Sequence, residues 1–364
     1  MDLNKQKTIQ EQTAGDNSVL NQVENTTGNV IIHNYSYPSN PMDATQVVTI
    51  ASSVYEGMFN IQRQSFTDIA IGQAESRINE FKSYLIPQLE KIQGIVEHLV
   101  DPKFNFLIGD AQKSIAQDGS KENLKRLSDL LILHIEKGQD KIIDSGIHKA
   151  LQIIPELDTK SLRGLTVLTA LNDVTPNSGN ISEGLDVLND LYGHLISEEL
   201  PQGYSWLDHL DILGAIRVSS LDIRDFKEYI CEKLKNYSQI GIKIDSDNHK
   251  RALEIMHANN IPDNVLIPNE CLSGYVRLKI SSIRSVQTQY QGICSDILNL
   301  YEINKTLQSN ANSKLVELWD SRDNLKKIHE WWGQIPKGMS FSVVGKVLAQ
   351  TYAKNCYPGF PDLI

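Results

Sequence analysis

The chain contains 364 residues with a formal net charge of -10, and 40% of them are hydrophobic. Its longest uninterrupted apolar run covers only residues 130–133, far short of the roughly 20 residues of a membrane-spanning helix. An acidic chain repels phosphate backbones at long range, so nonspecific nucleic-acid binding is also disfavoured. Composition therefore excludes an integral membrane protein and argues against a general nucleic-acid binder.

The first residues are polar and lack the apolar segment of a secretory signal, so we expect a cytoplasmic protein. Four cysteines occur, and none of them lies in a Cys-x-x-Cys pair. This spacing favours reduced thiols over a zinc site or a disulfide framework. The phosphate-binding patterns G-x-x-x-x-G-K-[ST] and G-x-G-x-x-G are also missing from the sequence. We therefore predict no metal and no cofactor.

Residues 1–40 form a polar arm with candidate strands at 14–23 and 28–35 and turn-forming residues at 25–29. The second candidate strand has three consecutive apolar residues, a pattern that favours burial on both of its faces. Because an isolated two-stranded hairpin is marginal in water, we expect the arms of several copies to pair. The residues predicted to carry this assembly are Val19, Val23, Val30, Ile31, Ile32 and Tyr35. The alternative is a disordered Gln/Asn-rich tail.

The body that follows the arm has helical periodicity. Apolar residues recur at spacings of three and four over residues 47–85, which predicts one long helix or a broken pair that ends near Pro87. Further helices are predicted at residues 88–100, 104–117, 121–137, 140–154 and 159–171, the last of them capped by Asp158. The Pro- and Gly-containing loop at 175–180 then predicts a boundary, so that residues 41–175 form one helical domain.

Residues 176–364 are predicted to form a second, mainly helical domain. A strand is predicted around Val276 and Leu278, because these apolar residues alternate with Arg277 and Lys279. Together with a candidate strand at 240–244 and a helix capped by Asp247, it predicts a small winged-helix-like unit. The remaining helices are predicted at 182–200, 220–237, 285–332 and 342–354. The predicted fold class is therefore mainly α, with an N-terminal β-hairpin arm, a multi-helix body and a small α+β unit.

Two segments imitate functional motifs. Residues 245–248 resemble the start of a calcium loop, but Lys250 and Met256 stand where that loop needs glycine and glutamate. In Asp208-His209-Leu210-Asp211, a histidine lies between two carboxylates, which can raise its pKa or orient it as a general base. No G-x-S-x-G nucleophile accompanies it. A histidine near the start of a helix with a structural role is the favoured interpretation, and we predict no catalytic residue.

A resemblance adds to this picture. The segment Gly15-Asp16-Asn17-Ser18, continued by Asn21-Gln22 and then by Asn29-Val30-Ile31-Ile32, resembles the N-terminal signature of a family of poorly characterised bacterial proteins with a helical body. Residues 101–104 and 341–349 are also similar to parts of that family. The resemblance implies a bacterial cytoplasmic protein, and similar arms occur on proteins linked with defence against phages. It implies no catalytic residues.

These observations favour a non-enzymatic homo-oligomer, an interaction scaffold or sensor whose main partner is another copy of itself. A different protein is a second expected kind of partner, whereas nucleic acid and membrane are not expected. One alternative is an enzyme whose site is assembled around His209 with Asp208 and Asp211. The other is a nucleic-acid-binding protein that uses residues 240–281.

Overall fold

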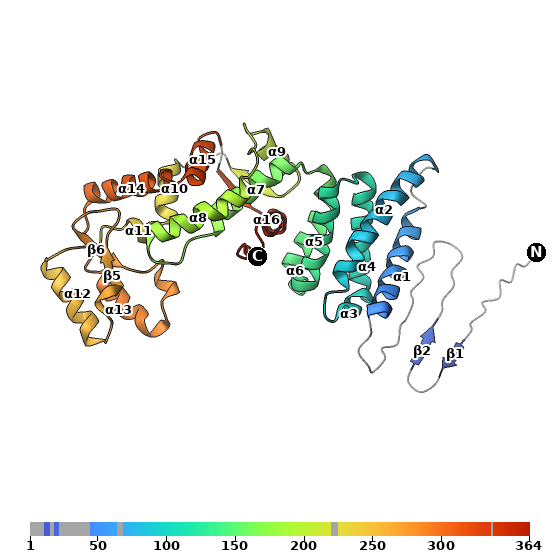
Figure 1. The fold of residues 1–364 in the computed structure, drawn as a ribbon, viewed down its shortest axis with the longest axis horizontal. Helices are drawn as coiled ribbons and strands as arrows, with labels where there is room; N and C mark the ends of the chain where they lie inside the picture. The colour runs from blue at the N-terminus through green and yellow to red at the C-terminus, as the bar shows by residue number, and fades with distance from the viewer. Residues whose placement is uncertain (1–10, 15–17, 22–43, 64–67, 220–224, 336–337) are drawn as a thin grey trace, which may run out of the picture. The chain divides into compact units, whose positions relative to one another are not determined.

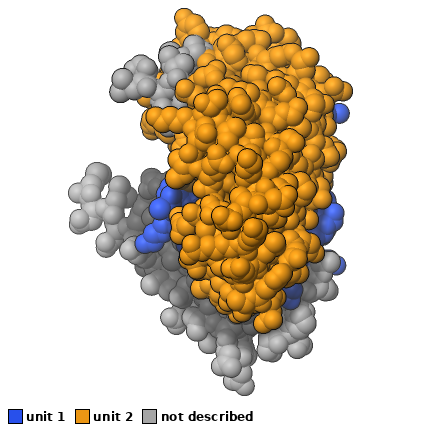
Figure 2. Space-filling view, turned by 90° about the vertical axis from the view of Figure 1, so that its left-hand side faces the viewer, with its two compact units in different colours: residues 1–157 blue, residues 158–364 orange. Residues whose placement is uncertain are grey.

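The computed structural model describes residues 11–14, 18–21, 44–63, 68–219, 225–335 and 338–364 (Figure 1). The chain forms two compact units, Met1–Leu157 and Asp158–Ile364, which Figure 2 colours blue and orange. The described residues are mainly helical and their sheets have only two or three strands. This confirms the predicted fold class. Of the helices in the described ranges, none is both long and apolar enough to cross a bilayer.

The arm contains a short antiparallel hairpin. Strand β1 (Glu11–Ala14) pairs with β2 (Ser18–Asn21), and Thr13 lies opposite Val19. The predicted first strand, 14–23, is therefore divided, because Ala14 ends β1 and Ser18 begins β2. The residues between them in sequence, Gly15-Asp16-Asn17, are types that favour tight turns. The predicted turn at 25–29 and second strand at 28–35 lie outside the described residues.

The first unit is a bundle of helices arranged around α4. Its helices are α1 (Ala44–Arg63), α2 (Asp68–Leu89), α3 (Ile95–Leu99), α4 (Pro102–Gln117), α5 (Lys121–Lys137), α6 (Lys141–Ile153) and the short η1 (Ile154–Glu156). Helix α4 packs against α1, α2, α5 and α6, and its Leu107, Ala111 and Ile115 are fully buried. Because α4 contributes apolar side chains to several neighbours at once, it forms the centre of the core of this unit.

One helix boundary of this unit differs from the prediction. Helix α2 continues through Pro87 and ends at Leu89, and the helix predicted at 88–100 is reduced to the five residues of α3. Pro87 lies in the last turn of α2, so its missing N–H interrupts little of the helix. Gly94, with a φ of 76°, lies immediately before α3 and separates the two helices.

The second unit is organised around α7 (Thr159–Asp173), in which all residues from 161 to 171 are buried. Helix α7 packs against α16 (Val343–Cys356), α8 (Ile181–Leu195) and α9 (Ser205–Ile212). It therefore belongs with the C-terminal part of the chain, and the two units divide after Leu157 rather than after residue 175. The loop at 175–180 connects two helices of one unit.

The rest of this helical frame comes from separate parts of the sequence. Strand β3 (Ile216–Ser219) pairs antiparallel with β7 (Gly338–Phe341). The remaining helices are α10 (Phe226–Lys233), α11 (Lys235–Ser238), α14 (Lys305–Asp320) and α15 (Asp323–Trp332). The stretch predicted to be helical from about residue 285 to 332 contains several helices. Asn304 caps one of them, α14, by accepting hydrogen bonds from the backbone N–H groups of Thr306 and Leu307.

The predicted α+β unit is present between α11 and α14. It consists of β4 (Ile242–Lys243), α12 (Asp247–Ala258), η2 (Asp263–Val265), β5 (Leu266–Pro268), β6 (Tyr275–Leu278), η3 (Ile283–Ser285) and α13 (Thr288–Leu298). Its antiparallel sheet has the order β4-β6-β5. The core includes Ile242, Ala252, Met256, Val276 and Cys294. The cap of α12 is Ser246 rather than the predicted Asp247, which is the first residue of the helix.

Candidate functional site

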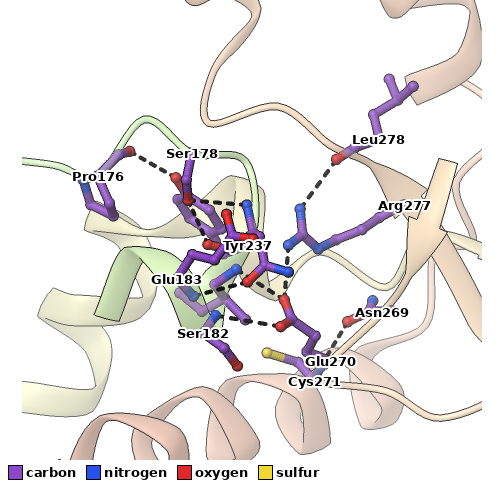
Figure 3. A network of polar contacts seen from close by, with 12 residues as sticks. Pro176, Ser178, Ser182, Glu183, Tyr237, Asn269, Glu270, Cys271, Arg277 and Leu278 are labelled. Atoms are coloured by element: carbon purple, nitrogen blue, oxygen red, sulfur yellow. Dashed lines mark hydrogen bonds and ion pairs between the residues drawn. The ribbon is translucent and has the colours of Figure 1, made fainter. Parts of the chain in front are cut away.

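The carboxylate of Glu270, in the turn between β5 and β6, is the centre of a network of polar contacts in the second unit (Figure 3). It accepts hydrogen bonds from the backbone N–H groups of Ile181 at 2.9 Å and Ser182 at 3.4 Å, at the start of α8. The first N–H groups of a helix carry partial positive charge and have no partner within the helix. Glu270 therefore supplies a second capping acceptor to α8, beside Asn180, which accepts from the N–H of Glu183 at 2.9 Å.

Glu270 also pairs with a buried guanidinium. The Nη2 atom of Arg277 lies 3.3 Å from a Glu270 carboxylate oxygen, and the Arg277 side chain has no solvent exposure. Its Nη1 donates to the carbonyl of Leu278 at 3.1 Å, and its charge lies 5.4 Å from the centre of the Tyr237 ring. The Tyr237 hydroxyl in turn donates to the carbonyl of Pro176 at 2.7 Å. These contacts attach the α+β unit to α8 and to the loop before it.

Asn269 completes this attachment from the same turn. It is buried, donates from its side-chain nitrogen to the carbonyls of Gln239 and Ile240 at 2.7 and 2.8 Å, and accepts from the N–H of Cys271 at 2.9 Å. Burial raises the pKa of the Cys271 thiol to about 12, so this cysteine is protonated near neutral pH and is a poor nucleophile. The contacts described above hold the α+β unit against its neighbours, which is a structural role. We call the four residues that make them the docking network, namely Glu270, Arg277, Asn269 and Tyr237.

The docking network bears on the nucleic-acid alternative. In a winged helix that binds DNA, the turn between the last two strands is free to contact the duplex. Here that turn contains Glu270, which is engaged by the start of α8. The exposed charges of α12 are also balanced, because Asp247 and Glu254 accompany Lys250 and Arg251. Residues 240–281 thus form the predicted elements without forming a basic surface along α12.

An open pocket lies where the first turn of α7 meets α9. Its lining residues are Asp158, Lys160, Ser161, Pro201, Gln202, Ser205, Trp206 and His209. Asp158 caps α7 as predicted, accepting from the backbone N–H of Ser161 at 2.8 Å and from its hydroxyl at 2.5 Å. Burial acts to raise the pKa of Asp158, but hydrogen bonds from Ser161 and Lys160 outweigh it and hold that pKa below its usual value. Lys160 itself pairs with Glu199 at 2.7 Å.

The candidate enzyme residues are not brought together at this pocket. His209 lines it, whereas Asp208 and Asp211 do not. All three lie in α9, where residues one or two positions apart point in different directions. Asp211 instead lies 3.9 Å from Nη1 of Arg217. Within the described residues, no group of three His, Cys, Asp or Glu side chains is arranged to hold a metal ion.

Only one of the predicted assembly residues lies among the described residues. This residue, Val19, lies in β2, where its backbone pairs with that of Thr13. The other five are outside the described residues, namely Val23, Val30, Ile31, Ile32 and Tyr35. Sequence reasoning missed the roles of Glu270 and Asn269, since nothing in the local sequence marks a turn that contacts a helix about 90 positions away. Their one local signal is an amide and an acidic residue directly after strand β5.

A comparison with known families places these elements in context. A family model described as ":-like" matches residues 42–363, a range that includes the described helices of both units. The arm lies before the matched range. No curated protein and no solved structure matches the chain.

Proposed function

Because the chain belongs to the ":-like" family over residues 42–363, we propose that the arm before this family body assembles copies of the chain into a non-enzymatic interaction scaffold or sensor. The observation that carries this proposal is the hairpin of the arm. Among the described strands, β1 and β2 pair only with each other. Hairpins of two strands are marginally stable on their own, and their outer edges present unpaired backbone groups.

Pairing between copies resolves both difficulties of the hairpin. Each added strand gives hydrogen-bond partners to the unpaired backbone groups of an edge. The consecutive apolar residues Val30, Ile31 and Ile32 would also be buried on two faces when strands from several chains associate. A shared sheet would also hold several helical bodies together, so that weak contacts of each body with a target add up through effective concentration. Such an arrangement suits a scaffold or sensor and requires no catalytic group.

The experiment is the absolute mass of the full chain in solution, measured by light scattering after size exclusion. We expect a multimer for the natural chain. Replacing Val30, Ile31 and Ile32 with aspartate in the full chain is expected to reduce the mass to about that of a single chain, 40.9 kDa, because charged residues cannot be buried in a shared sheet. Far-ultraviolet circular dichroism should show an unchanged helical body.

A matched control places the same three charges elsewhere. Val187, Ile212 and Ile303 are apolar residues of the second unit with 61%, 82% and 98% exposure, so replacing them with aspartate should leave the multimer intact. A monomeric natural chain, or a triple-aspartate arm variant that stays multimeric, would contradict the proposal.

The resemblance of the arm to those of proteins linked with defence against phages supports a narrower role. We propose that assembly through the arm acts in bacterial antiphage defence. Bacteria that carry the natural gene together with its neighbouring genes should show fewer phage plaques than bacteria that carry the triple-aspartate arm variant in the same setting. Equal plaque numbers over a broad set of phages would remove this narrower role and leave the assembly proposal standing.

A further inference from the structure

Three helices of the first unit bring two imidazoles, a carboxylate and an ammonium group together. One oxygen of Asp144 on α6, Oδ1, lies 3.0 Å from Nδ1 of His134 on α5 and 3.8 Å from Nε2 of His148. The other oxygen, Oδ2, lies 2.7 Å from Nζ of Lys103 on α4. The His134 side chain is 6% exposed and that of Asp144 is 10% exposed. We call these four residues the histidine cluster.

The central pair of the histidine cluster lies at hydrogen-bonding distance. Nδ1 of His134 and Oδ1 of Asp144 are both buried and 3.0 Å apart. A carboxylate oxygen accepts hydrogen bonds only, and an imidazole nitrogen donates only when it carries a proton. Because Lys103 pairs with the same carboxylate, a proton on His134 would add a second buried positive charge beside one negative charge, which is unfavourable.

The ring of His134 is closely packed on two sides. It stacks on Phe104 with ring centres 5.8 Å apart and planes 14° apart. On another side, a methyl group built on Gly138 would lie 2.5 Å from Nδ1 of His134, so only glycine at this position leaves space for the ring.

We propose that the histidine cluster is a proton-responsive contact, in which protonation of the buried His134 loosens the packing of α5 on α4 and α6. The imidazolium then competes with Lys103 and His148 for the single negative charge of Asp144. A helix contact whose packing depends on one proton is the kind of element that a sensor needs.

The direction of the response follows from the surroundings of His134. Burial lowers the pKa of His134, the carboxylate of Asp144 acts to raise it, and the charges of Lys103 and His148 add to the lowering. Helices α2 and η1 also pack against α5, and no ion pair joins His134 to a described residue of either. A lowered pKa means that the present packing favours the neutral ring, so this packing is most stable above the ordinary histidine pKa and weakens as the pH falls below it.

The test is hydrogen exchange of the full chain, followed by mass spectrometry at pH 7.5 and at pH 5.5 and scaled for the intrinsic effect of pH. Peptides from α5 and α6 are expected to exchange severalfold faster at the lower pH, while those from α8 change little. A His134→Gln variant cannot take up the proton, so its α5 and α6 peptides should show no acceleration.

His194→Gln is the matched control, because His194 likewise lies near a carboxylate, with Nε2 3.9 Å from Asp190, but on the exposed surface of α8. It should behave like the natural chain. Lys103→Met provides a second test, since removing that charge makes protonation of His134 easier and should move the acceleration to higher pH. Absence of acceleration in the natural chain, or equal acceleration in His134→Gln, would overturn the proposal.

Discussion

Replacing Glu270 with alanine is expected to lower the free energy of unfolding of the second unit by about 3–5 kcal/mol. The change leaves the guanidinium of Arg277 fully buried without its carboxylate partner. It also removes the acceptor that Glu270 offers to the N–H groups of Ile181 and Ser182. Urea titration followed by tryptophan fluorescence is suited to this measurement, because all four tryptophans of the chain lie between residues 206 and 332 and so report on the second unit.

The control for Glu270 is another carboxylate near the same sheet. Glu302 accepts one hydrogen bond from the hydroxyl of Tyr275 at 2.7 Å, so Glu302→Ala should cost only about 0.5–1.5 kcal/mol. Adding Arg277→Met to Glu270→Ala is expected to recover part of the loss, because the buried charge is then removed together with its partner. If Glu270→Ala costs no more than Glu302→Ala, the docking network does not hold the α+β unit in place.

The docking network also shows how far alternation in a sequence can predict a site. The pattern around Val276 and Leu278 correctly predicts strand β6, but it places Arg277 on the solvent side of a half-buried strand. In the structure Val276, Arg277 and Leu278 are all buried. Because β6 is the central strand of its sheet and Arg277 packs near Tyr237 and Glu270, both of its faces are covered. The second face is covered by Tyr237 of α11 and by Glu270 in the turn after β5, contacts that the alternation within β6 does not contain.

Local signals predict a helix cap at Asp158, which caps α7 by accepting from the N–H of Ser161. No local signal predicts the histidine cluster, since His134 and Asp144 lie on different helices and only the packing of α5 on α6 brings them together. The same limit explains why the sequence places α7 in the first domain, because the contact of α7 with α16 joins segments far apart in the sequence.

Trp319 is the second residue whose replacement should have a large effect. It is fully buried in α14, and its ring centre lies 5.5 Å from that of Phe226 and 6.5 Å from that of Tyr192. Its indole N–H donates to the carbonyl of Leu325 at 2.7 Å. Trp319→Ala would leave a large cavity and an unpaired carbonyl, so we expect a loss of about 3–5 kcal/mol in the free energy of unfolding of the second unit.

The origin of that loss can be separated with two further variants, measured by urea titration followed by circular dichroism. Trp319→Phe retains most of the ring and removes the hydrogen bond, and it should cost clearly less than Trp319→Ala. Trp332 stacks on Tyr229 with ring centres 4.5 Å apart but is only half-buried. Replacing it with alanine should therefore lower the free energy of unfolding by less, because part of the cavity opens to water. An equal loss for Trp332→Ala and Trp319→Ala would show that the core of this unit is not centred on Trp319. The expected order instead places the strongest packing where α10, α14 and α15 meet, next to the helices that hold the α+β unit.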